Sequence, residues 1–221
     1  MLHAVYLHGF ASSPDSGKAR YLRARLSGAG IPLHVPDLNA PDFGTLTVTR
    51  MLDQLDSVLQ ALPGGPVAFI GSSLGGFVAL HATARRLARA PDAHPVTRLV
   101  LLAPALDFAS GRDGWLTAEE TDEWRRTGWR DVVHHASGRI VPLHYALWED
   151  AGRYDALGIA VGIPTLIFHG RRDPVVRPST VEAYAEGKAH VTLRMLDDDH
   201  QLAGHLDQVW VETAAFLGLA P

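Results

Sequence analysis

The chain has 221 residues, 47% of them hydrophobic, and it contains no cysteine. This length and composition predict one domain with a sizeable core, and the missing thiols exclude disulfides and thiolate chemistry. The formal net charge is −4 without a long basic run, which argues against nucleic acid and membranes as partners and favours a small-molecule substrate. Neither a signal peptide nor a membrane-spanning window is visible, so we expect a cytoplasmic location.

Short apolar runs alternate with helical patterns along the chain. The runs predict six strands, at Ala4–Leu7, Leu33–Pro36, Val67–Ile70, Arg98–Leu102, Thr165–His169 and Val191–Leu196. The segments between and after them predict helices at Gly17–Ala29, Thr45–Leu62, Leu74–Ala90, Ser179–Gly187 and Leu206–Leu217. This alternation is typical of a mostly parallel, doubly wound sheet, whose ligands bind at the carboxyl ends of the strands. Functional residues are therefore expected just after each strand.

The first strand ends in the sequence His8-Gly9-Phe10. A turn at this place can offer a backbone N–H, that of Phe10, to an oxyanion. The imidazole of His8 is expected to brace the turn by hydrogen bonds instead of transferring protons.

The third strand runs into GSSLGG, residues 71–76. The pattern GxSxG fits this stretch in one register, with Ser73 at its centre, and its glycines suit a sharp strand-to-helix turn that exposes a nucleophile. The N–H of Leu74 at the start of the following helix is the second expected oxyanion donor. A phosphate-binding loop is disfavoured because Phe77 stands where its lysine would be required.

After the fourth strand, residues 104–162 are expected to form a cap insertion in an otherwise single domain. They include four of the five tryptophans: Trp115, Trp124, Trp129 and Trp148. The stretch WLTAEETDEWRRTGW predicts a short amphipathic helix with Thr117 as its N-cap. Two readings stay open, a lid that contacts the substrate and a surface excursion that the indoles pin to the core. The neighbouring pair His134-His135 is a poor metal site, because adjacent side chains point in different directions.

Serine needs a base and an orienting acid, and candidates for both follow later strands. Asp173 lies in the loop after the fifth strand, and His200 in the loop after the sixth, which gives the chain order Ser, Asp, His. Asp107, just past the fourth strand, is the alternative acid, and Asp173 as a simple turn cap is the structural alternative.

Twelve histidines make position the deciding criterion for the base. His169 and His190 lie at the ends of strands and are more typical of packing or surface residues, while His205 is the weaker alternative to His200. The run of acidic residues at 197–199 is more typical of a solvated loop than of a metal cluster, and no HExxH pattern accompanies it. We predict neither a metal nor a cofactor.

Together these motifs resemble those of the α/β-hydrolase superfamily, and most closely those of small bacterial YqiA-like serine esterases. The resemblance rests on LHGFASSPDSGKA, GSSLGG, GRRDPVV and DDDHQL, and covers residues 1–103 and 163–221. It implies a three-layer α/β-hydrolase fold, Ser73, Asp173 and His200 as the catalytic triad, and hydrolysis of small esters with short acyl groups. The six predicted strands give a mostly parallel, six-stranded sheet, smaller than the eight-stranded sheet of larger members of the superfamily.

Two other functions are compatible with this fold. An acyl-CoA thioesterase would benefit from a basic approach for the nucleotide phosphates, and Arg171, Arg172 and Arg177 lie beside the acid loop. A non-catalytic small-molecule-binding protein would retain a ligand without reacting with a serine probe. The sequence does not indicate an oligomeric state.

Overall fold

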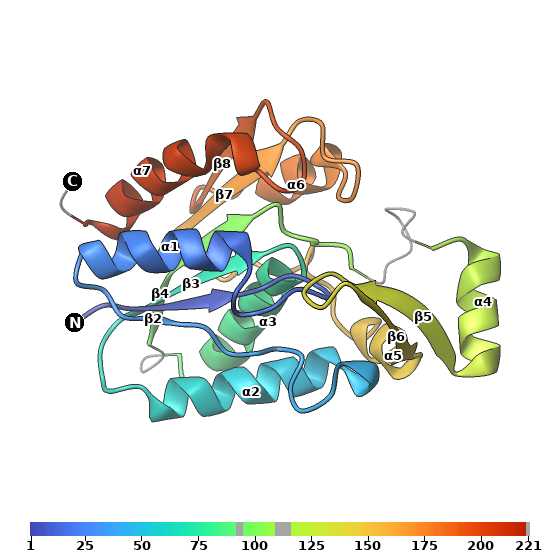
Figure 1. Ribbon diagram of the computed structural model, residues 1–221. Coiled ribbons are helices and arrows are strands. Elements are labelled where there is room, and N and C mark those ends of the chain that lie inside the picture. Colours follow the sequence, from blue (N-terminus) through green and yellow to red (C-terminus); the bar gives the residue numbers. More distant parts are fainter. Residues whose placement is uncertain (92–94, 109–115, 220–221) are drawn as a thin grey trace.

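A computed structural model describes residues 1–91, 95–108 and 116–219, and its main feature is one parallel six-stranded sheet (Figure 1). The strand order is β2-β1-β3-β4-β7-β8, and every neighbouring pair is parallel. The strands are β1 (His3–Leu7), β2 (Leu33–His34), β3 (Val67–Ser72), β4 (Val96–Leu102), β7 (Thr165–Gly170) and β8 (Val191–Leu196). The predicted doubly wound sheet is confirmed, because β2 lies on one side of β1 and β3 on the other.

Helices cover both faces of this sheet and give it three layers (Figure 1). The helices α1 (Gly17–Gly28) and α7 (Leu206–Leu217) lie on one face, and α2 (Val48–Ala61) and α3 (Leu74–Arg89) on the other. The short helix α6 (Pro178–Ala185) packs against β7 and β8. Each face of the sheet packs into its own hydrophobic core, and successive residues of a strand point to opposite faces. Val5 and Leu7 lie in the core beneath α2 and α3, and Ala4 and Tyr6 lie in the core beneath α1 and α7.

The predicted helix at Thr45–Leu62 begins later than expected. Asp42 accepts hydrogen bonds from the backbone N–H groups of Gly44 and Thr45, at 3.1 Å each, which forms the separate 3₁₀ turn η1 (Phe43–Thr45). Thr47 then caps α2 through a 3.2 Å hydrogen bond from the Arg50 N–H. Two capping side chains therefore split one apolar pattern into two elements.

Between β4 and β7 the chain leaves the sheet and forms an excursion beyond the carboxyl ends of the strands (Figure 1). It contains α4 (Ala118–Thr127), the antiparallel hairpin β5 (Trp129–His134) and β6 (Arg139–His144), and α5 (Ala146–Ala151). The predicted helix is confirmed as α4, and Thr117 and Glu120 form a complete capping box at its start. The hairpin and α5 were not predicted. Within the three described ranges, no helix has the length and apolar character needed to cross a membrane.

Candidate active site

Ser73 occupies a strained turn between β3 and α3. Its backbone has φ 53° and ψ −119°, a conformation that costs a non-glycine residue of order 1–3 kcal/mol. The end of β4 and the residues just after it hold this turn in place: the Ser73 N–H donates to the Leu102 carbonyl at 2.9 Å, and the Ser73 carbonyl accepts from the Ala105 N–H at 3.2 Å. The Ser73 side chain is partly exposed between buried neighbours, as a nucleophile requires.

The glycines around Ser73 are explained by close packing of three chain segments. A Cβ at Gly75 would lie 2.0 Å from the Leu7 carbonyl oxygen, and a Cβ at Gly71 would lie 2.5 Å from the carbonyl oxygen of Gly75. A Cβ at Gly76 would meet Pro104, which follows β4, at 2.8 Å. Since real Cβ atoms do not approach backbone so closely, only glycine allows β1, the turn and β4 to meet here.

The predicted acid and base lie together at the carboxyl edge of the sheet. The Nδ1 atom of His200 is 2.7 Å from Oδ2 of Asp173, whose side chain is fully buried. The other carboxylate oxygen accepts from the N–H groups of Val175 and Val176, at 2.8 and 2.9 Å. Burial favours the neutral acid, but the hydrogen bonds from His200 and from the backbone outweigh it and hold the pKa of Asp173 below its usual value.

The loops that carry Asp173 and His200 are joined along their backbones. The N–H of Arg172 donates to the Asp198 carbonyl at 3.0 Å, and a Cβ at Gly170 would lie 2.4 Å from the Asp199 carbonyl oxygen. The loop after β8 therefore lies directly across the end of β7, which places its histidine beside the acid.

The alternative residues have other surroundings. His205 bonds to Asp198 at 2.8 Å, and Asp107 is buried just after β4. Asp197 pairs with Arg172. Across residues 1–91, 95–108 and 116–219, no group of three or more histidine and acidic side chains is arranged to hold a metal ion.

The loop after β1 lies against Ser73. A Cβ at Gly9 would be 3.3 Å from the Cβ of Ser73 and 3.9 Å from its Oγ, so the loop that carries Phe10 passes beside the serine. Buried His8 braces this loop: its Nε2 accepts from the Leu38 N–H at 3.0 Å, and its Nδ1 lies 2.9 Å from the Gly9 carbonyl. Burial lowers the pKa of His8 and keeps it neutral, which suits the structural role expected for it.

Two polar groups near these residues make contacts that sequence reasoning did not predict, although His169 was expected to be a packing or surface residue. His169 is buried beside the acid, with its Nε2 3.0 Å from the Val176 carbonyl and 3.4 Å from Oδ2 of Asp173. Lys18 lies with its Nζ 3.4 Å from the Oγ of Ser72, the residue before the candidate nucleophile. The signal for His169 was present, since a strand ends in His-Gly both there and at His8. Nothing in the local sequence indicates the contact of Lys18, which joins residues 54 positions apart.

The excursion touches the loop after β1. The N–H of Ala136, in the turn of the hairpin, donates to the Ala11 carbonyl at 3.2 Å. The ring of His134 packs edge-on against the ring of Phe43, with the two centroids 4.8 Å apart. The ring centroids of Phe43 and Phe10 are in turn 5.5 Å apart. The hairpin thus packs beside the predicted oxyanion loop.

The tryptophans of the excursion have different environments. Trp124 is buried, and its Nε1 donates to the Leu143 carbonyl at 3.0 Å. Trp148 packs partly buried against the core, whereas Trp129 is about half exposed. Trp115 lies outside the described residues. Trp124 and Trp148 fit the reading in which indoles pin the excursion to the core.

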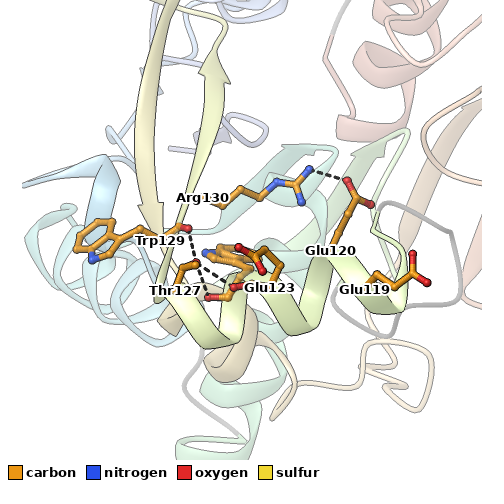
Figure 2. Close-up of a pocket in the computed structure, with 7 residues that line it drawn as sticks. Glu119, Glu120, Glu123, Thr127, Trp129 and Arg130 are labelled. Atoms are coloured by element: carbon orange, nitrogen blue, oxygen red, sulfur yellow. Dashed lines mark hydrogen bonds and ion pairs between the residues drawn. The ribbon is translucent and has the colours of Figure 1, made fainter.

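A pocket of about 520 Å³ lies on the excursion between α4 and the start of β5 (Figure 2). It is lined by Glu119, Glu120, Glu123, Trp124, Thr127, Trp129 and Arg130. Figure 2 shows Arg130 reaching Glu120, at 3.1 Å, so one carboxylate of the lining is already paired. None of these residues is a predicted site residue, and the pocket is separate from the edge that carries Asp173 and His200.

Comparisons with known proteins agree with this architecture. A family model described as "Uncharacterised protein family (UPF0227)" matches residues 3–217. A curated relative, the mitochondrial palmitoyl-protein thioesterase ABHD10 of Bos taurus, is 25% identical over 187 residues, which are 78% of this chain and 57% of the relative; the chain thus spans little more than half of that protein.

Solved structures agree as well. The crystal structure of a protein described as a hydrolase, from Agrobacterium vitis S4, is 26% identical in sequence and has a TM-score of 0.82. The match covers 97% of this chain and 87% of the Agrobacterium chain. The ferulic acid complex of Est1E from Butyrivibrio proteoclasticus is 20% identical in sequence and has a TM-score of 0.82. The match covers 98% of this chain and 88% of the Est1E chain. These likenesses confirm the three-layer α/β-hydrolase fold.

Proposed function

The chain belongs to the uncharacterised protein family UPF0227, a YqiA-like family of α/β hydrolases, and we propose that it is a serine hydrolase of small carboxylic esters with short acyl groups. The observation that carries the proposal is the strained, partly exposed Ser73 at the same edge of the sheet as the hydrogen-bonded pair Asp173–His200. Strain held in place by the surrounding backbone is typical of a functional position.

In the proposed mechanism, the Oγ of Ser73 attacks the acyl carbonyl while Nε2 of His200 accepts its proton. Because Asp173 accepts a hydrogen bond from Nδ1 of His200, it fixes the tautomer that leaves Nε2 free to act as the base. The low pKa of Asp173 keeps it ionised, so it also stabilises the imidazolium that forms. The alcohol then leaves with that proton, and water hydrolyses the acyl-enzyme by the same route.

Backbone amides supply the proposed oxyanion hole. Leu74 is the first residue of α3, where N–H groups lack partners within the helix, and Phe10 lies on the turn that passes beside Ser73. Each donor is expected to contribute about 3 kcal/mol of transition-state stabilisation.

The first prediction concerns the nucleophile. Ser73→Ala should lower kcat by at least about 10³-fold, because the covalent route is lost, without changing the cooperative unfolding transition. The measurement is turnover of p-nitrophenyl butyrate together with intact-mass detection of one fluorophosphonate adduct per chain. Ser57→Ala, at an exposed position of α2, is the matched control and should leave both readouts unchanged. Turnover by the Ser73→Ala variant at the wild-type rate would refute the assignment.

A thioesterase is the second candidate, because the curated relative is a palmitoyl-protein thioesterase. Of the three arginines expected near a nucleotide, Arg172 is paired with Asp197, which weakens the case for an acyl-CoA substrate. Rates for p-nitrophenyl acetate, butyrate and octanoate, set beside those for butyryl-CoA and an S-palmitoylated peptide, separate these functions. Folded protein that acquires no fluorophosphonate label would instead indicate a non-catalytic binding protein.

A further inference from the structure

Lys18 is an unusual side chain in this molecule. Eighteen of the twenty basic residues are arginines, and the other lysine is Lys188. Lys18 lies near the start of α1 and donates to Ser72 Oγ, at 3.4 Å. The hydroxyl of buried Tyr6, on β1, also bonds to Ser72 and to Ser16. An ammonium group from α1 is therefore attached to the last residue of β3, directly before Ser73.

The charge of Lys18 also interacts with the two loops that carry the acid and the base. The charged groups that act on it are Asp173 from the loop after β7, and Asp198 and Asp199 from the loop after β8. Asp173 is the partner of His200, and Asp198 is the partner of His205. Lys18 thus links the end of β3 electrostatically to loops whose strands are two and three positions further along the sheet.

We propose that Lys18 is a positioning residue of the proposed hydrolase, whose ammonium group holds the loops of Asp173 and His200 in register with Ser73, so that hydrolysis is fastest while Lys18 is protonated. The proposal rests on the serine hydrolase function above. It gives Lys18 no contact with the substrate.

The physical reason is that opposite charges attract: Asp173, Asp198 and Asp199 all act on the charge of Lys18, which is itself bonded to Ser72. This attraction draws the loops that carry the three carboxylates toward the end of β3, where the contact with Ser72 holds the ammonium group. Burial lowers the pKa of Lys18 to about 8, against the opposing effect of the three carboxylates, so the charge is lost in mildly alkaline solution. Arginine would remain charged there. Burial raises the pKa of Tyr6 to about 12, so this hydroxyl stays neutral over the same range.

The test compares pH profiles of kcat/KM for p-nitrophenyl butyrate between pH 6 and 10. The kcat/KM of the wild-type protein should decline at alkaline pH, with a midpoint near pH 8. Lys18→Met should lose about tenfold in kcat at pH 7, as for residues coupled in one network, with little change in KM and no decline near pH 8. Lys18→Arg should keep its rate to higher pH than wild type. Lys188→Met, at the turn between α6 and β8, is the matched control and should reproduce the wild-type profile.

The outcomes separate this proposal from the proposed function. If the wild type is labelled by a fluorophosphonate but Lys18→Met retains both the rate and the decline near pH 8, the role of Lys18 is refuted and the hydrolase stands. If the wild type is neither labelled nor active, the hydrolase itself is refuted. Should Lys18→Met fail to fold by circular dichroism, Lys18→Arg decides, because an unshifted alkaline decline in that variant also refutes the proposal.

Discussion

At the scale of single residues, close packing and not backbone conformation requires the glycines beside Ser73. Neither Gly71 nor Gly75 has positive φ, so an alanine at either position would have an allowed backbone conformation. What excludes a side chain is the distance to backbone atoms, 2.0 Å from the Leu7 oxygen in the case of Gly75. The strain of the turn instead falls on Ser73, which has φ 53°.

Gly75→Ala should therefore cost at least about 3 kcal/mol of unfolding free energy, because β1 must move away from α3 to admit the methyl group. Gly28→Ala is the matched control. It lies at the end of α1 with no atom within 4 Å of the added carbon, and it should stabilise the protein by up to about 1 kcal/mol. Urea unfolding measures both. Equal stability of the two variants would contradict the packing account.

At the scale of elements, the excursion is attached to the main body through helix α5. The buried carboxylate of Asp150 accepts from the N–H of Thr49 and from its hydroxyl, both at 2.7 Å. Thr49 lies in the first turn of α2, where N–H groups lack helical partners and a negative charge is favourable. Asp150 thus serves α2 as an N-terminal acceptor supplied by a distant segment.

Asp150→Ala should lower the free energy of unfolding by about 1–3 kcal/mol, since it removes the acceptor of the Thr49 N–H at the start of α2. The Thr49 hydroxyl keeps its contact with the Tyr154 hydroxyl, at 2.7 Å. Glu149→Ala changes the exposed neighbouring residue and should alter stability by less than about 0.5 kcal/mol. The measurement is the urea midpoint of each variant. A loss as large for Glu149→Ala as for Asp150→Ala would assign the effect to α5 itself and not to the contact.

The hairpin of the excursion shows why some elements escape prediction. The residues of β5 alternate between exposed and partly buried, and β6 contains Pro142, which disfavours strand. Its position is determined by distant contacts, such as that between Ala136 and Ala11. The strands β1, β3 and β7, by contrast, are buried throughout. The observed bounds of all six sheet strands lie within two residues of the predicted ones.

At the scale of the whole molecule, some contacts of the candidate site could be predicted from the sequence and others could not. That Asp173 and His200 meet follows from the rule that parallel strands bring their carboxyl ends to one edge, so the sequence order of loops predicted the pair. The contacts of Lys18 and His169 depend on how α1 and the β7 loop pack, and no periodic pattern encodes them. Contacts that depend on how a helix or a loop packs are therefore the ones that sequence reasoning does not predict.

Lys18 also affects the stability of the whole chain. Folding lowers its pKa from 10.5 to about 8, chiefly through burial, so between these values the unfolded chain binds a proton that the folded chain lacks. The contribution of Lys18 to the free energy of unfolding consequently rises with pH over this window, and its destabilising effect is complete below pH 8.

Lys18→Met removes a partly buried charge, so the variant should be more stable than wild type at pH 7, and the difference should shrink as the pH approaches 10.5. Urea unfolding at pH 7 and pH 9.5 measures this, with Lys188→Met as the control for loss of a lysine elsewhere. A variant that is less stable than wild type at pH 7 would mean that the three carboxylates outweigh burial. A variant that is more stable yet slower would identify Lys18 as a group retained for catalysis at the expense of stability, as functional sites often are.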